Sequence, residues 1–165
     1  MKFLHVIFLT LFLLATNTTS YAAPVVNDKA ALGSLKNGKG VFLIDIGDAK
    51  KMNFYLEVIQ GTVKGMQAQG VKPDFVLVYI GPSVKYLTTA PAKDIEASIS
   101  DVLMDIENNV TKLEELGVKQ EICAVATDVF GIDNNTLTPG LTLVGDGFIS
   151  LIGYQAQGYY LVPVF

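Results

Sequence analysis

Cys123 is the single cysteine of the 165-residue chain, and it is the best candidate for a chemically reactive side chain. A lone cysteine can act as a nucleophile when its thiolate is reachable, and helix N-terminal amides near residues 128–130 or a lysine such as Lys85 would favour that form. The alternative is a packing role, because free cysteine is among the most buried residue types and apolar neighbours surround this one. The sequence leaves both roles open.

The composition excludes several common chemistries. The only histidine is His5, inside a segment that we expect to be removed, so the mature chain has no imidazole. A Ser/His/Asp or Cys/His pair cannot form, and a zinc site would need carboxylates plus one thiol. GxGxxG and P-loop motifs are also missing from the sequence. We therefore expect no metal site and no cofactor.

Two other groups of residues are candidates for binding. Gly81, Pro82 and Ser83 follow an apolar run and form either an anion-binding nest or a simple turn. Asp45 lies in another apolar run, where it is either a functional carboxylate in a crevice or a strand-end residue that reaches a loop amide. Asp48 is either a helix cap or a ligand.

Apolar runs and helical stripes alternate along the chain. Strands are expected at residues 41–46, 75–80, 121–126, 141–144 and 159–164. Helices are expected at residues 53–69, 95–116 and 147–157, where apolar residues recur every three or four positions, and residues 127–138 form a polar connection. Strands separated by such helices pair in parallel through right-handed crossovers. The sequence therefore predicts an α/β fold with about five mainly parallel strands and helices on both faces.

In doubly wound sheets the ligand crevice lies beyond the carboxyl ends of the strands. Three segments follow strand ends in this chain: Gly47-Asp48, Gly81-Pro82-Ser83 and the residues after Cys123. We expect these segments to meet at one edge of the sheet, which is the predicted site.

The N-terminus has the pattern of a cleaved signal peptide. A charged start precedes an apolar run over residues 3–14, and a small, polar stretch follows. That run is shorter than the roughly twenty residues of a spanning helix, so a retained anchor is the less favoured alternative. Ser20 and Ala22 fit a small-x-small site that places cleavage after Ala22, with the next alanine as a near alternative. We expect a signal peptide at 1–22 and a single exported domain at 23–165, without a membrane segment after cleavage.

The charge of the chain argues against polyanionic partners. The formal net charge is −4, arginine is absent, and the lysines form no run. Neutralising the phosphates of a nucleic acid or an anionic membrane surface requires clustered positive charge. We therefore expect no nucleic-acid partner.

Three stretches together resemble the DsrE/DsrF-like family. They are residues 76–87 (VLVYIGPSVKYL), residues 116–123 (LGVKQEIC) and the tail over residues 141–163 with its QAQGYY segment. The resemblance implies a three-layer flavodoxin-like sandwich, assembly into trimers or hexamers, and cysteine persulfide relay through Cys123 with a sulfur donor or acceptor protein. Members of the family often carry a histidine directly before the loop glycine, where this chain has Ile80. This departure argues against an acid/base or metal role at that loop.

Two functions follow from different classes of protein. The first is a periplasmic sulfur-relay or sulfurtransferase-like protein in which Cys123 carries a persulfide. The second is a non-catalytic oligomeric binding protein, in which the crevice at 81–83 holds a small ligand or the surface meets a protein partner, and Cys123 only packs. Tyr154, Tyr159 and Tyr160 form either part of an oligomer surface or ordinary half-buried aromatics.

Overall fold

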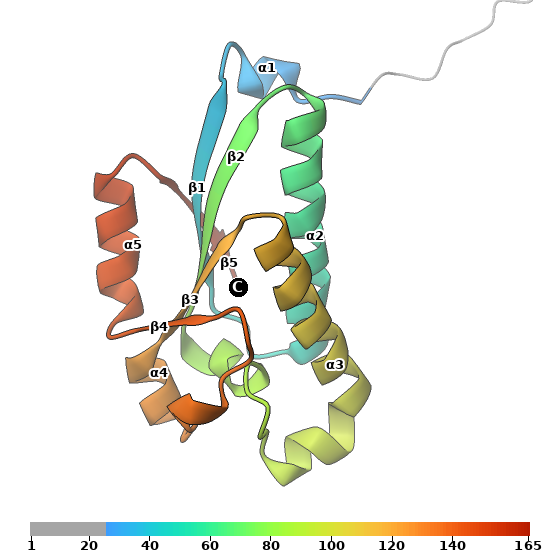
Figure 1. Cartoon of the computed structure of the whole chain (residues 1–165), viewed down its shortest axis with the longest axis vertical. Coiled ribbons are helices and arrows are strands. Elements are labelled where there is room, and N and C mark those ends of the chain that lie inside the picture. Colours follow the sequence, from blue (N-terminus) through green and yellow to red (C-terminus); the bar gives the residue numbers. More distant parts are fainter. Residues whose placement is uncertain (1–25) are drawn as a thin grey trace, which may run out of the picture.

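The computed structural model describes residues 26–165 and contains one sheet of five parallel strands (Figure 1). In chain order the strands are β1 (Asn37–Ile44), β2 (Lys72–Tyr79), β3 (Lys119–Cys123), β4 (Thr142–Val144) and β5 (Tyr160–Val164). Their order across the sheet is β4-β3-β2-β1-β5. The predicted α/β fold is confirmed, while the expected signal peptide at 1–22 and its cleavage site lie outside the described residues.

Helices cover both faces of the sheet. They are α1 (Lys29–Leu32), α2 (Ala49–Ala68), α3 (Lys93–Glu115), α4 (Ala124–Val129) and α5 (Gly147–Ala156), with 3₁₀ turns η1 (Gly81–Tyr86) and η2 (Asn134–Thr136). Figure 1 shows α2 and α3 on one face and α5 on the other. Strands β1, β2, β3 and β4 lie side by side in chain order. The connection through α5 then leads back across the sheet to β5, which lies on the free side of β1. Right-handed crossovers require the helix of this return connection to lie on the opposite face.

Two aspartates set the starts of helices that follow strands. The Asp48 carboxylate accepts a hydrogen bond from the Lys51 amide at 2.8 Å at the start of α2. The Asp146 carboxylate accepts one from the Phe148 amide at 2.8 Å at the start of α5. Each cap satisfies an amide that has no partner within its helix, so Asp48 is a helix cap, and both helices begin beside the carboxyl edge of the sheet.

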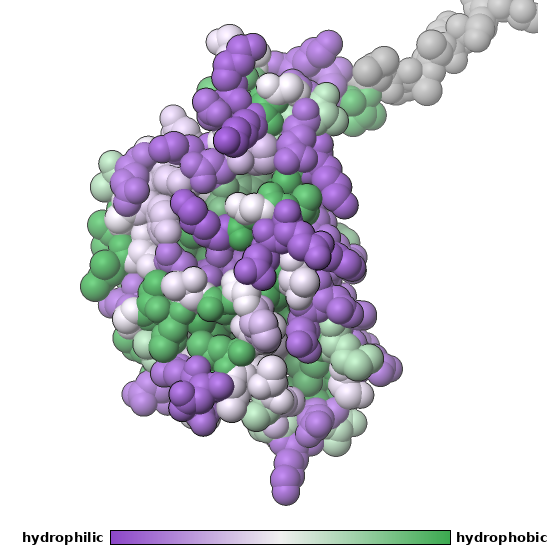
Figure 2. Space-filling view, in the orientation of Figure 1, coloured by the Kyte–Doolittle hydropathy of each residue, from purple (hydrophilic) through white to green (hydrophobic). Residues whose placement is uncertain are grey.

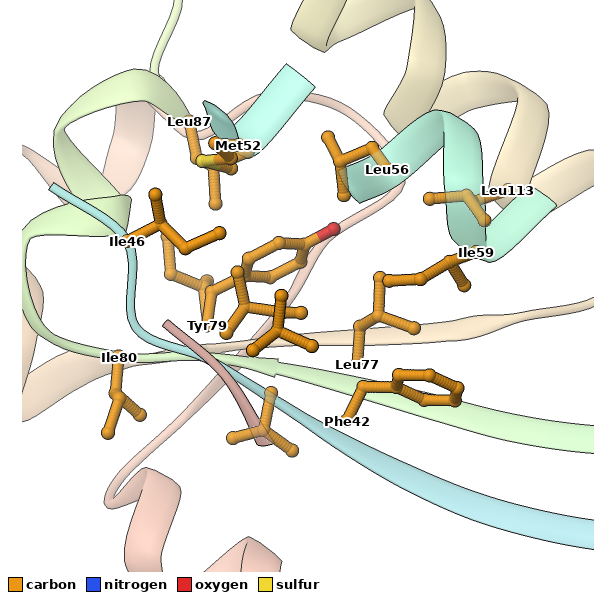
Figure 3. Close-up of a cluster of buried hydrophobic side chains, with 14 of the residues drawn as sticks. Phe42, Ile46, Met52, Leu56, Ile59, Leu77, Tyr79, Ile80, Leu87 and Leu113 are labelled. Atoms are coloured by element: carbon orange, nitrogen blue, oxygen red, sulfur yellow. The ribbon is translucent and has the colours of Figure 1, made fainter. Parts of the chain in front are cut away.

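The main core lies between the sheet and the pair α2 and α3. Figure 3 shows side chains of β1, β2, α2 and α3 filling this layer around the Tyr79 ring. The Tyr79 hydroxyl donates to Gln120 Oε1 at 2.8 Å, and Gln120 Nε2 donates to the Val110 carbonyl at 2.8 Å. Ile80 points to the other side of the sheet in the same view. The two faces of β2 therefore contribute separately to the core and to the site described below.

The expected strand at 121–126 is wrong in its second half. β3 ends at Cys123, which is extended, and α4 begins at Ala124. The apolar residues of this run suit a buried strand and a buried helix equally, and alanine is the strongest helix former. The earlier end of the strand matters because it places Cys123 at the carboxyl edge of the sheet.

No helix within residues 26–165 has the length and hydropathy needed to cross a membrane. This finding concerns only the part of the chain that the structure describes.

Candidate functional site

A cavity of about 470 Å³ opens at the carboxyl edge of the sheet, on the side of α5. Its volume lies within the range of small-molecule sites. The polar lining comes from Asp45, Gly81, Cys123 and Asp146, which follow or end β1, β2, β3 and β4. The apolar lining comes from Ile80, Val125, Ala126, Val129, Phe130 and Phe148. The loops after four parallel strands therefore meet around one apolar pocket.

Cys123 lies in the wall of this cavity, at the point where β3 passes into α4. Its side chain is 5% exposed, and its Sγ accepts a hydrogen bond from the Gly147 amide at 3.2 Å. Gly147 is the first residue of α5, so the amide belongs to the positive end of a helix. An amide aimed at sulfur from a helix N-terminus stabilises negative charge on that sulfur.

Gly147 has no room for a side chain. A Cβ on this residue would lie 2.5 Å from Ile80 Cγ2, 3.2 Å from Cys123 Cβ and 3.3 Å from Val78 Cγ1. The start of α5 therefore rests directly on β2 and β3. This close approach is what brings the Gly147 amide within hydrogen-bond distance of the thiol.

Gly81 and Asp45 also line the cavity. Gly81 has a φ of +54°, and a Cβ on it would collide with the Asp45 carboxylate. The Asp45 side chain is partly buried, and the structure gives its carboxylate no hydrogen-bond partner within residues 26–165. The structure therefore places Asp45 in the lining of the cavity and shows no contact of its carboxylate with a loop amide in the described residues.

Pro82 and Ser83 lie next to the cavity but do not line it. The buried Ser83 hydroxyl is within hydrogen-bond distance of two carbonyl oxygens, that of Ile80 at 2.6 Å and that of Ile44 at 3.2 Å. Pro82 lies against Gly47, where an added Cβ would be 3.5 Å from the proline ring. In the described residues these two positions hold the loop in place, and Gly81 alone of the three predicted binding residues reaches the pocket.

A comparison with known protein families identifies the family of this chain. Residues 39–164 match the DsrE/DsrF-like family. The chain belongs to this family. No curated protein matches it.

Solved structures share the fold of this DsrE-like chain. A protein of unknown function, MTH1491 from Methanobacterium thermoautotrophicum, has a TM-score of 0.58 at 18% identity, covering 77% of this chain and 99% of its own. The ychN protein from E. coli has a TM-score of 0.57 at 15% identity, covering 77% and 99%. A conserved protein of unknown function, BT1422 from Bacteroides thetaiotaomicron, has a TM-score of 0.53 at 16% identity, covering 78% and 95%. At these identities the likeness concerns the fold alone.

The cavity of the DsrE-like chain is acidic and carries no basic lining residue. Asp45 and Asp146 are its charged groups. Lys85 lies beside it, with Nζ 5.7 Å from the centroid of the Phe130 ring and 5.7 Å from that of Tyr86. Among residues 26–165 no group of three or more metal-ligating side chains occurs. The described site has the chemistry of a thiol in an apolar, negatively charged pocket.

Tyr86 links the loops after β1 and β2 beneath the site. Its hydroxyl donates to the Gly47 carbonyl at 2.6 Å. Burial raises the pKa of Tyr86, and the nearby Asp48 carboxylate raises it further, so the phenol remains a neutral donor. This bond ties η1 to the segment between β1 and α2.

The rim of the cavity is unusually apolar for a solvent-facing surface. Val129 is 71% exposed and Phe148 is 63% exposed, and Ile149 and Ile152 of α5 are exposed beside them. Figure 2 shows hydrophobic side chains gathered on the side of α5 and around β4. Exposed apolar patches of this kind mark sites of interaction in soluble proteins.

Sequence reasoning missed the residues that complete the pocket. It placed thiolate-favouring amides near 128–130, whereas the amide that contacts the thiol belongs to Gly147. The available signal was the Asp146-Gly147 pair directly after a strand, which marks a helix start at the carboxyl edge. The apolar contribution of Phe148 had no such signal, because its position in a helical stripe is equally typical of a core residue.

Proposed function

We propose that this DsrE-like protein is a periplasmic sulfur-relay protein that carries a sulfane sulfur as a persulfide on Cys123. The observation that carries the proposal is the hydrogen bond from the Gly147 amide to Cys123 Sγ in the wall of an open cavity. The amide at the start of α5 donates directly to the sulfur, and the thiolate is the nucleophilic form of cysteine. The apolar lining would limit the contact of a bound persulfide with water.

The proposed chemistry has two balanced steps. The Cys123 thiolate attacks the outer sulfur of a donor persulfide, R–S–SH; a new S–S bond forms on Cys123, and the R–S⁻ thiolate leaves with the electrons of the broken S–S bond. In the second step an acceptor thiolate attacks the outer sulfur of Cys123–S–SH, which regenerates the Cys123 thiolate. Neither step needs an external oxidant, a metal or a second cysteine.

Oligomerisation and a partner protein belong to the same proposal. The exposed apolar rim at Val125, Val129 and Phe148 supports contact with another copy or with a sulfur donor or acceptor. The trimer or hexamer implied by the family remains a proposal, as does export after cleavage at Ala22. N-terminal sequencing of the protein recovered from the periplasm would test the export step, and a start at Ala23 is the expected result.

The test of the relay uses the fact that Cys123 is the only thiol of the chain. The folded mature protein is treated with polysulfide and analysed by intact mass, and alkylation by iodoacetamide is timed across pH. We expect a mass gain of one sulfur that reductant removes, together with alkylation of the folded state. Cys123→Ser is the matched control, and it should gain no sulfur. Labelling only after unfolding, with no sulfur gain, would contradict the proposal.

A second candidate function is supported by the low exposure of the thiol. Cys123 is 5% exposed and the cavity of about 470 Å³ is mostly apolar, as in a binding protein for a small apolar ligand. In that case Cys123→Ala should bind a neutral apolar fluorophore such as N-phenyl-1-naphthylamine as well as the wild type does. Filling the pocket by Ala126→Phe should abolish binding in both backgrounds.

A further inference from the structure

Helix α5 is held on its face of the sheet by few apolar contacts. Of its ten residues only Gly147 and Leu151 are buried. Its outward side carries Phe148, Ile149 and Ile152, which are all exposed. Most helices in proteins are fixed by the packing of an apolar face, so the position of α5 depends more than usual on its polar contacts.

Two hydrogen bonds join α5 to β3, one toward each end of the helix. Near the start of α5, the Gly147 amide donates to Cys123 Sγ at 3.2 Å. About two turns further on, the Tyr154 hydroxyl donates to Glu121 Oε1 at 2.6 Å. Cys123 and Glu121 are two residues apart on β3, so both side chains point to the face that α5 covers. The helix therefore runs along β3 in the opposite direction.

The length of the Tyr154 side chain allows both hydrogen bonds to form at once. Gly147, Leu151 and Tyr154 make up the inner stripe of α5, at spacings of four and three residues. Seven helical residues rise by about 10.5 Å, whereas two strand residues span only about 6.6 Å. Side chains of a helix lean toward its N-terminus, so a long one at position 154 covers this difference and reaches Glu121.

The bond between Tyr154 and Glu121 is costly to break. Glu121 Oε2 is buried and has no hydrogen-bond partner among residues 26–165, so Tyr154 is the only donor that the structure gives to this carboxylate. A carboxylate with a buried oxygen that loses its one donor is left unpaired. The Tyr154 ring also packs edge-on against Tyr159, with centroids 5.1 Å apart. The Tyr159 hydroxyl donates to Asp74 Oδ2 of β2 at 2.9 Å, which fixes this pair of rings against the sheet.

We propose that Tyr154 and Glu121 are positioning residues for Cys123, because their hydrogen bond holds α5 where the Gly147 amide reaches the thiol. Neither residue lines the cavity. They act through α5, which carries the donor amide at its first residue and contributes Phe148 to the lining of the cavity. The consequence for sulfur transfer rests on the proposed function, whereas the positioning of α5 does not.

The first experiment measures hydrogen exchange of the Gly147 amide by NMR. Tyr154→Phe keeps the ring but loses the bond to a charged acceptor, so exchange should be faster by about tenfold. Glu121→Gln keeps an acceptor oxygen, and exchange should stay within about threefold of the wild-type rate. An unchanged rate in Tyr154→Phe would overturn the proposal.

The control for this experiment is Ile106→Val. It weakens the core on the other face of the sheet, where Ile106 of α3 is fully buried. The Gly147 amide should exchange at the wild-type rate in this variant. Equal acceleration in Ile106→Val and Tyr154→Phe would mean that exchange follows overall stability, and it would refute a specific role of Tyr154.

The second experiment measures access to Cys123, whose side chain is 5% exposed. Alkylation of the folded protein by iodoacetamide at one fixed pH should be about fivefold faster in Tyr154→Phe, because the start of α5 moves off the thiol more often. Tyr160→Phe removes an exposed hydroxyl of β5 and should leave the rate unchanged. Equal rates in Tyr154→Phe and the wild type would contradict the proposal.

The two experiments also separate this proposal from sulfur relay. Faster Gly147 exchange in Tyr154→Phe, together with a wild type that gains no sulfur from polysulfide, would support the positioning of α5 and refute the relay. A wild type that gains sulfur, together with unchanged Gly147 exchange in Tyr154→Phe, would refute the positioning role and leave the relay in place.

Discussion

The amide nitrogen of Gly147 and the sulfur of Cys123 lie 3.2 Å apart, although 24 positions separate the two residues in the chain. The contact joins the start of α5 to the end of β3, and it exists because Gly147 has no side chain to hold the helix away from the sheet. Both the shape of the cavity and the polarity around the thiol depend on this approach.

Gly147→Ala should lower the free energy of unfolding by about 1–3 kcal/mol, because the added methyl group overpacks the contact with Ile80. Urea denaturation of the folded protein measures the change. Gly153→Ala is the matched control in the same helix, since a Cβ at Gly153 meets nothing within 4 Å. The control should be stabilised by up to about 1 kcal/mol. Equal effects of the two substitutions would show that α5 does not rest on the sheet as described.

Asp45→Asn should change which reagents reach Cys123. Both residues line one cavity, and the Asp45 carboxylate repels anions that enter it. The rate of alkylation by iodoacetate, relative to that by neutral iodoacetamide, should rise by up to about fivefold, because two unit charges a few ångströms apart repel by roughly 1 kcal/mol even in water.

The control for this prediction is Asp101→Asn. It removes the same charge from an exposed position of α3, on the other face of the sheet. The ratio of the two alkylation rates should stay at the wild-type value in this variant. A ratio that rises equally in both variants would mean that net charge, and not the lining of the cavity, decides access.

Tyr154→Phe should flatten the loss of stability at alkaline pH. Burial raises the pKa of Tyr154 above the ordinary 10.0, and its 2.6 Å hydrogen bond to Glu121 raises it further. Between pH 10 and the folded-state pKa the folded protein binds one more proton at this site than the unfolded chain does, so stability falls as pH rises. Above pH 10 the substitution should reduce the fall of the free energy of unfolding with pH by up to about 1.4 kcal/mol per pH unit. Below pH 9 the dependence of the free energy of unfolding on pH should be unchanged.

Urea denaturation at several pH values between 8 and 11.5 measures this slope. Tyr160→Phe removes a phenol that is exposed on β5, and it controls for the loss of a hydroxyl as such. An identical alkaline slope in Tyr154→Phe and the wild type would show that Tyr154 ionises as freely in the folded state as in the unfolded chain.

Much of the fold could be predicted because its signals are local. The apolar stripe of α3 identifies a helix by its period, and the short apolar runs of β1 and β2, each followed by a glycine, indicate buried strands by their length. The alternation of these elements then requires parallel strands, because their connections are too long for hairpins. The sequence does not fix the boundary of an element where one composition suits both helix and strand, as in the run around Cys123.

The sequence by itself determined a parallel α/β sheet with the only cysteine in its third strand, and a composition without histidine or arginine in the region from residue 26 onward. The position of Cys123 at the carboxyl edge of the sheet was decided by the structure, which ends this strand at Cys123. Only the tertiary structure decided that Gly147 donates to Cys123, that Asp45 faces the cavity, and that Ser83 turns away from it. Period and composition specify which face of an element is buried. They do not specify how closely two elements approach, because that distance depends on side-chain volumes contributed by residues far apart in the chain.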